Sequence, residues 1–80
     1  MQNAHAQFTI TGIVKDKSDE SPLPQVSIRL LSARDSTFVT GVSSKNDGAF
    51  SLNVAKAGNY IAAFSFLGYK TAYEPVRLSS

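Results

Sequence analysis

The residue types that most often act as nucleophiles, general bases or metal ligands are scarce in this sequence. The chain contains no cysteine and a single histidine, His5, which lies close to the N-terminus. Chain termini are commonly mobile, so a histidine-based triad or general base would depend on a poorly positioned imidazole. Zinc and redox metals also lack their preferred nitrogen and sulfur ligands. We therefore expect no catalytic residue and no cofactor in this chain.

One group of oxygen-bearing side chains has the spacing of a calcium-binding loop. Asp16, Ser18 and Glu20 alternate as the first ligands of such loops do. The positions that require a glycine and a final bidentate glutamate both hold serine instead. We favour a solvated loop over a calcium site and predict no metal ligand. The glycines are isolated from one another and form no phosphate-binding motif.

Aromatic side chains are the remaining groups that could bind a ligand, by stacking against sugar rings. Five of them lie in the C-terminal part of the chain: Tyr60, Phe64, Phe66, Tyr69 and Tyr73. Their spacing of two residues over much of this segment fits core packing better than a binding platform. A glycan site would require at least two coplanar, exposed rings among the three tyrosines. Tyr69 and Tyr73 are the candidates for residues that face a ligand.

The length and charge of the chain limit its size and its partners. Eighty residues make a single small domain, which we place at residues 8–78, with 79–80 beginning a linker to a downstream region. With 42% apolar and 18% charged residues, the composition is typical of a folded domain. The net charge of +2 comes from scattered basic residues, which does not indicate binding to nucleic acid or anionic membranes. The longest apolar stretch, 60–67, is too short to span a bilayer.

Two interpretations stay open for residues 1–7. Ala4, His5 and Ala6 have the small–x–small pattern of a signal-peptidase site, but the apolar region that should precede it is missing. These residues are either an arbitrary flexible terminus or the remnant of a cleaved signal peptide.

Apolar residues recur at every second position along nearly the whole chain, which predicts an all-β fold. The expected strands cover residues 8–14, 26–31, 37–43, 50–54 and 60–66, with one or two more within 69–78. The side chains predicted to face the core are Val26, Ile28, Leu30, Phe50, Leu52, Val54, Tyr60, Ala62, Phe64 and Phe66. In the third strand the sequence does not decide whether Phe38 and Val42, or Val39 and Gly41, face inward.

Several turns are marked by residues that tolerate positive φ angles. The structural turn residues are Asn46, Asp47, Gly48, Gly58 and Gly68. The first three lie between two strand-like segments, which predicts a hairpin. Tyr60, just after the turn at Gly58, is either a tyrosine corner, with its hydroxyl bonded to the loop backbone, or an ordinary core tyrosine.

Six or seven short strands, with a turn signal about every ten residues, favour an antiparallel sandwich with Greek-key connections. A small barrel is the alternative. Residues 60–66 are apolar or small on both faces, which predicts a central strand. Pro75 predicts an edge strand or a bulge for the last segment.

The order and spacing of several sequence blocks resemble the carboxypeptidase regulatory-like domain, over about residues 8–78. More narrowly, they resemble the version at the N-terminus of TonB-dependent outer-membrane receptors of Bacteroidetes-type bacteria. The blocks are TGIVKD (11–16), PLPQVSI (22–28), DST (35–37), TGVSSKNDGAFSL (40–52), AGNY (57–60) and SFLGYKT (65–71). Gln25 and Ala57 stand where this family often has glycine and proline, which leaves the shapes of two turns undecided.

The resemblance implies a seven-stranded, transthyretin-like, antiparallel Greek-key sandwich without catalytic activity. It implies a noncatalytic accessory domain on the periplasmic side of the outer membrane, preceded by a signal peptide and followed by a plug and a large β-barrel. Its partners would be that plug and barrel or a periplasmic protein, with membrane contact only through the downstream region. Two alternatives remain: a carbohydrate-binding module, and an assembly domain of a surface protein that is not a transporter.

Overall fold

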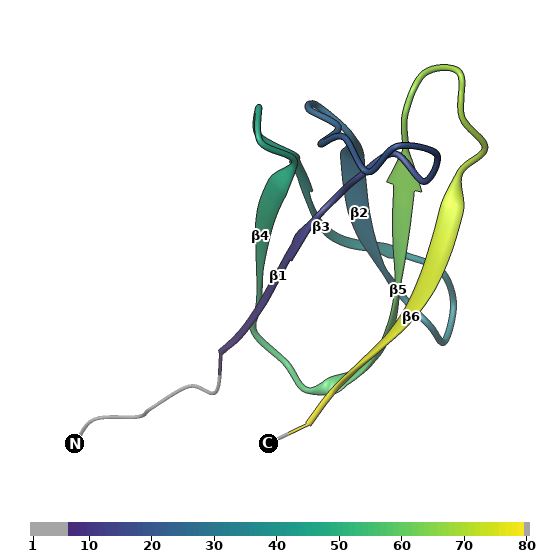
Figure 1. The fold of residues 1–80 in the computed structure, drawn as a ribbon. Helices are drawn as coiled ribbons and strands as arrows, with labels where there is room; N and C mark the ends of the chain where they lie inside the picture. The colour runs from purple at the N-terminus through teal and green to yellow at the C-terminus, as the bar shows by residue number, and fades with distance from the viewer. Residues whose placement is uncertain (1–6, 80) are drawn as a thin grey trace.

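The computed structural model describes residues 7–79, which form two antiparallel β-sheets and no helix (Figure 1). The strands are β1 (Phe8–Ile13), β2 (Ser27–Ser32), β3 (Phe38–Ser43), β4 (Ala49–Val54), β5 (Gly58–Ser65) and β6 (Ala72–Leu78). β1 and β4 form one sheet, and the other has the order β3-β2-β5-β6. The predicted all-β class is therefore confirmed. Residues 1–6, which hold most of the segment 1–7 interpreted as either a flexible terminus or a signal-peptide remnant, lie outside the described residues. Within residues 7–79, no helix is long and apolar enough to cross a bilayer.

The predicted number of seven strands is wrong for this part of the chain, which contains six. The difference arises after β5, where the sequence allowed one or two strands. Residues 72–78 form one continuous strand that pairs with β5 from Phe64↔Ala72 to Gly58↔Leu78. All seven residues of β6 pair with β5 without interruption, so this segment forms one strand and not two.

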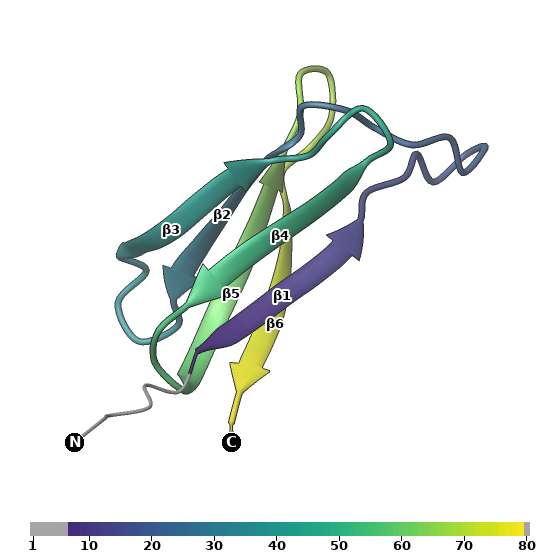
Figure 2. The same cartoon turned by 90° about the vertical axis from the view of Figure 1, so that its left-hand side faces the viewer.

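The hydrophobic core lies between the two sheets, and both contribute to it (Figure 2). The four-stranded sheet supplies Ile28 and Leu30, which are completely buried, and the two-stranded sheet supplies Leu52 and Val54. Burial of one such aliphatic side chain contributes about 1.5–3 kcal/mol to folding. The predicted inward faces of β2 and β4 are therefore confirmed. Half-buried residues that complete the core are Phe8, Ile10, Val14, Leu23, Val42, Phe50, Phe64, Phe66, Val76 and Leu78.

The turn at Asn46, Asp47 and Gly48 exists, but the hairpin predicted from it does not. The backbone N–H of Gly48 donates to the Lys45 carbonyl (2.8 Å), which closes the turn. The strands on its two sides then separate, because β3 pairs with β2 and β4 pairs with β1. The turn therefore carries the chain from one sheet to the other. A turn motif specifies only local backbone geometry, whereas strand pairing depends on distant segments.

A register shift between Leu30 and Leu31 explains why the sequence did not settle the orientation of β3. Val42 pairs with Ile28 and is half-buried, so it faces the core. After the shift, Phe38 pairs with Leu31 on the opposite face and is 63% exposed. The sequence offered Phe38 with Val42, or Val39 with Gly41, as the inward-facing pair, and neither pair faces inward as a whole. An extra residue in one strand changes the side on which the following side chains lie.

The predicted positions of the last two strands are confirmed. β5 lies between β2 and β6, and β6, which contains Pro75, forms the edge. Tyr60 at the start of β5 is buried, and its hydroxyl donates a hydrogen bond to the Lys56 carbonyl (2.7 Å). Tyr60 therefore forms a tyrosine corner, one of the two alternatives that the sequence left open.

Candidate functional site

The loops after β1, β3 and β5 gather at one end of the fold (Figure 1). Backbone hydrogen bonds fix the β1–β2 loop to the β3–β4 loop: Val14 N–H donates to the Gly48 carbonyl (2.8 Å), and Gln25 N–H donates to the Ser44 carbonyl (2.9 Å). Within the β1–β2 loop, Leu23 N–H donates to the Val14 carbonyl (3.0 Å). A bridge between Lys15 and Pro22 closes the outer part of the β1–β2 loop. This loop is therefore held against the body of the fold.

The end of the β1–β2 loop is anchored by Ser44, a buried polar residue. Its hydroxyl donates to the Leu23 carbonyl (2.7 Å) and accepts from the Val26 backbone N–H (2.9 Å). Between these two residues, Gln25 has a left-handed φ of 59°. The turn thus keeps a conformation that favours glycine, although the chain has glutamine there. Ser44 therefore fixes the positions of Leu23 and Val26.

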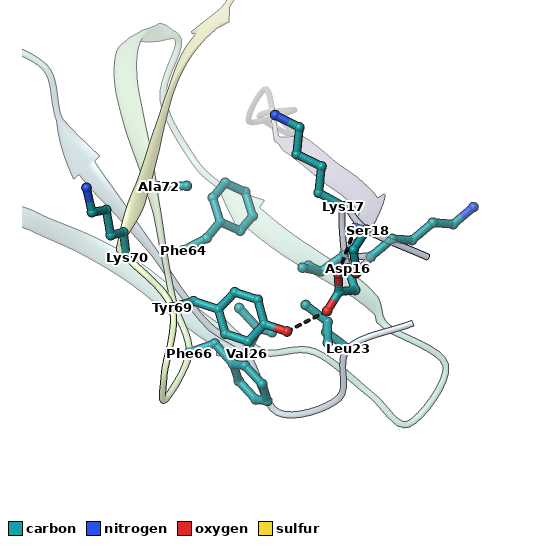
Figure 3. A pocket seen from close by; sticks show the side chains of 12 residues that line it. Asp16, Lys17, Ser18, Leu23, Val26, Phe64, Phe66, Tyr69, Lys70 and Ala72 are labelled. Carbon is teal, nitrogen blue, oxygen red and sulfur yellow. Dashed lines mark hydrogen bonds between the residues drawn. The ribbon is translucent and has the colours of Figure 1, made fainter. Parts of the chain in front are cut away.

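A pocket of about 320 Å³ opens between the β1–β2 and β5–β6 loops (Figure 3). This volume is at the lower end of the range for small-molecule sites. Its apolar lining consists of Val14, Leu23, Val26, Phe64, Phe66 and Ala72. Val26 is buried and Leu23, Phe64 and Phe66 are half-buried, so the pocket reaches the edge of the hydrophobic core.

Asp16 and Tyr69 join the two loops across the pocket. The Tyr69 hydroxyl donates to Oδ2 of Asp16 (2.5 Å), and the Tyr69 ring packs against Phe66 with the ring centroids 5.4 Å apart (Figure 3). Oδ1 of Asp16 accepts hydrogen bonds from the hydroxyl and the backbone N–H of Ser18 (2.6 and 2.8 Å). These donors stabilise the ionised carboxylate, so the Ser18 hydroxyl, followed by Tyr69, lowers the pKa of Asp16 to about 2. The hydrogen bond between Tyr69 and Asp16 also raises the pKa of the Tyr69 hydroxyl.

Three lysines, Lys15, Lys17 and Lys70, lie on the rim of the pocket, against one carboxylate, Asp16. Figure 3 shows Lys17 and Lys70 on opposite sides of Phe64. All three lysines are exposed, so their ammonium groups stay in water while the pocket below is apolar. The rim is therefore positively charged around an apolar interior.

The chemistry of these groups favours binding over catalysis. Asp16 is a weak base because of its low pKa, and no histidine or cysteine lines the pocket. Within residues 7–79, no three histidine, cysteine, aspartate or glutamate side chains lie close enough together to hold a metal ion. Asp16 and Ser18, the first two residues with calcium-loop spacing, instead bond to each other. The arrangement can bind a ligand or a partner.

The turn residues identified in the sequence lie in turns of the structure, except Gly58, which is the first residue of β5. Gly48, Gly58 and Gly68 have φ angles of 81°, 151° and 87°. The Asp47 carboxylate accepts from the Ala49 backbone N–H (3.0 Å), and Asn46 is exposed beside it. Gly48 is buried under the β1–β2 loop, whereas Gly68 is at the exposed tip of the β5–β6 loop.

The two tyrosines predicted to face a ligand lie on different surfaces. Tyr69 lines the pocket and is 50% exposed. Tyr73 is 61% exposed on β6 and pairs with Ala63, on the face of the four-stranded sheet opposite to Phe64. The third tyrosine, Tyr60, is buried. The described residues therefore do not place two exposed tyrosine rings side by side as a stacking platform.

Sequence reasoning did not find the pocket. The sequence suggests only calcium binding as a ligand role for Asp16 and no ligand role for Lys70, because 53 positions separate Asp16 from its partner Tyr69. The signal in the sequence is the placement of Phe66, Tyr69 and Lys70 around Gly68, at the end of the predicted strand 60–66. This pattern indicates a loop with apolar side chains, but it does not indicate which other segment of the chain that loop contacts.

These features define the class of the protein: a small, all-β, antiparallel domain with a loop-lined pocket at one end. The sequence model of the carboxypeptidase regulatory-like domain matches residues 9–80. The chain therefore belongs to the carboxypeptidase regulatory-like domain family, as its sequence blocks predicted. No curated protein and no solved structure matched the chain in the comparisons.

Proposed function

We propose that this chain is a noncatalytic accessory domain of an outer-membrane protein, specifically an N-terminal domain of a TonB-dependent receptor on the periplasmic side. Family membership over residues 9–80 carries the proposal, and the blocks that resemble the receptor version support it. In this proposal, the two sheets are the layers of a transthyretin-like sandwich. The partners are the plug and barrel of the same receptor, or a periplasmic protein.

The edge of the four-stranded sheet formed by β3 is the proposed contact surface. An edge strand has unpaired N–H and C=O groups that can accept a further strand. The opposite edge, β6, contains Pro75, which has no N–H to donate. β3 contains no proline, and its first residues, Phe38 and Val39, are 63% and 41% exposed. A strand added at β3 would satisfy backbone groups and also cover apolar surface.

Site-specific photo-cross-linking in the full-length protein tests this contact. A photoreactive residue at position 39 should form an adduct with the plug, the barrel or a periplasmic protein. The matched control places the same residue at Tyr73, an exposed aromatic position on β6. Adducts at position 73 but not at position 39 would contradict the choice of edge.

The gene that encodes this domain tests the receptor assignment directly. We expect a signal peptide before the domain and, after it, a plug followed by many strands with alternating hydrophobicity. A downstream region without a plug and barrel would overturn the receptor assignment and support an assembly role on another surface protein. A catalytic domain encoded directly after this one would contradict the proposed placement altogether.

A further inference from the structure

We propose that the pocket between the β1–β2 and β5–β6 loops binds a small amphiphile that has an apolar tail and one anionic head group. The tail would contact Leu23, Phe64 and Phe66, and the head group would lie among the rim lysines. This inference rests on the pocket alone and does not depend on the proposed receptor.

The apolar interior accounts for the tail. The pocket reaches half-buried side chains that pack against the hydrophobic core, and its volume is about 320 Å³. Ser44 and the Asp16–Tyr69 hydrogen bond hold its two walls in place without a ligand. A preformed apolar site of this kind gains affinity with each methylene group that enters it, by about fourfold per CH₂.

The rim accounts for the sign of the head group. Lys15, Lys17 and Lys70 line the opening, with Asp16 as the single carboxylate among the lining residues. Asp16 already accepts three hydrogen bonds, from Ser18 and Tyr69. Asp19, whose charge also acts on Tyr69, lies outside the lining. Among the lining residues three ammonium groups outnumber one carboxylate, so an anionic head group is favoured over a cationic one.

Titration of the ¹⁵N-labelled domain with octanoate, followed by NMR, tests the proposal. We expect shifts of the backbone amides of Leu23, Phe66 and Tyr69, and none at Asn59, which lies near the opposite end of β5 and outside the lining. Affinity should rise from hexanoate to octanoate, by about fourfold for each CH₂ that enters, and reach a plateau once the pocket is full. Heptanol and heptylammonium, which have the same heptyl tail as octanoate with a neutral or cationic head group, should bind more weakly in that order.

Charge variants locate the head group. Lys70→Glu should weaken octanoate binding by about three- to tenfold, and Asp16→Asn should strengthen it by about two- to fivefold, because a repulsive charge is removed. Lys45→Glu is the matched control, since Lys45 is an exposed lysine outside the lining. Amide spectra of the free variants check that each one is folded.

Three results would overturn the proposal. The first is the absence of any shift with octanoate up to its solubility limit. The second is equal affinity for the anionic, neutral and cationic probes. The third is an equal effect of Lys70→Glu and Lys45→Glu, which would show that only the net charge of the domain matters.

Discussion

Alanine at Gly48 should destabilise the fold more than alanine at Gly68, although the two glycines have similar backbone conformations. Their φ angles are 81° and 87°, so an alanine at either position is strained by about 1–2 kcal/mol. Their surroundings differ. A Cβ atom at Gly48 would lie 2.5 Å from the Val14 carbonyl oxygen, whereas no atom lies within 4 Å of a Cβ at Gly68.

The contact at Gly48 is costly because the Val14 carbonyl cannot move freely. It accepts a hydrogen bond from Leu23 N–H (3.0 Å), and Val14 N–H donates to the Gly48 carbonyl (2.8 Å). Overpacking of a fixed site costs about 1–3 kcal/mol. We therefore expect a loss of about 1–2 kcal/mol for Gly68→Ala and about 2–5 kcal/mol for Gly48→Ala. A domain of this length has a total stability of about 4–12 kcal/mol, so the second loss is severe.

Urea unfolding of both variants, followed by circular dichroism, measures these losses. The smaller conformational freedom of alanine in the unfolded chain affects both variants equally and cancels in the comparison. The difference between the two unfolding free energies therefore reports the contact with Val14. Equal destabilisation of the two variants would refute the close approach of Gly48 to the β1–β2 loop.

Three further predictions concern the core, the tyrosine corner and pH. Ile28→Ala should lower the unfolding free energy by about 2–5 kcal/mol in urea titrations, whereas Leu67→Ala, at a position that is 95% exposed, should have little effect; similar values for both would contradict the assigned core. Tyr60→Phe removes the hydroxyl that bonds to the loop carbonyl and should cost about 0.5–1.5 kcal/mol, seen as a lower Tm; an unchanged Tm would argue against the corner. The pKa of Asp16 is lowered to about 2 in the folded state, so its contribution to stability is present above about pH 4 and is lost as the pH falls through 2. Carboxyl NMR titration should show this value and a higher one in Tyr69→Phe; an unchanged pKa in that variant would contradict the hydrogen bond.

The sequence by itself determined where most strands lie and which of their side chains face the core. Alternation of apolar residues has the same period as the pleat of a strand, so Ile28, Leu30 and Leu52 could be assigned inward from local pattern alone. The family was also determined by the sequence, because the order and spacing of its turn and strand blocks are features of the chain. The backbone reversal at Asp47 and Gly48 was predictable for the same reason, since it depends on adjacent residues.

Only the tertiary structure decided which strands pair and what the loops form together. No local pattern distinguishes a hairpin from a turn that leads to the other sheet, because the pairing of β3 with β2 and of β4 with β1 depends on segments far along the chain. The orientation of Phe38 depended on a register shift for the same reason. The pocket depends on the hydrogen bond between Asp16 and Tyr69, which are 53 positions apart. The two residues come together because β1 and β5, the strands before them, belong to the two sheets that pack against each other. Such stacking is the sum of many weak contacts between distant residues, and a short stretch of sequence contains only one side of each.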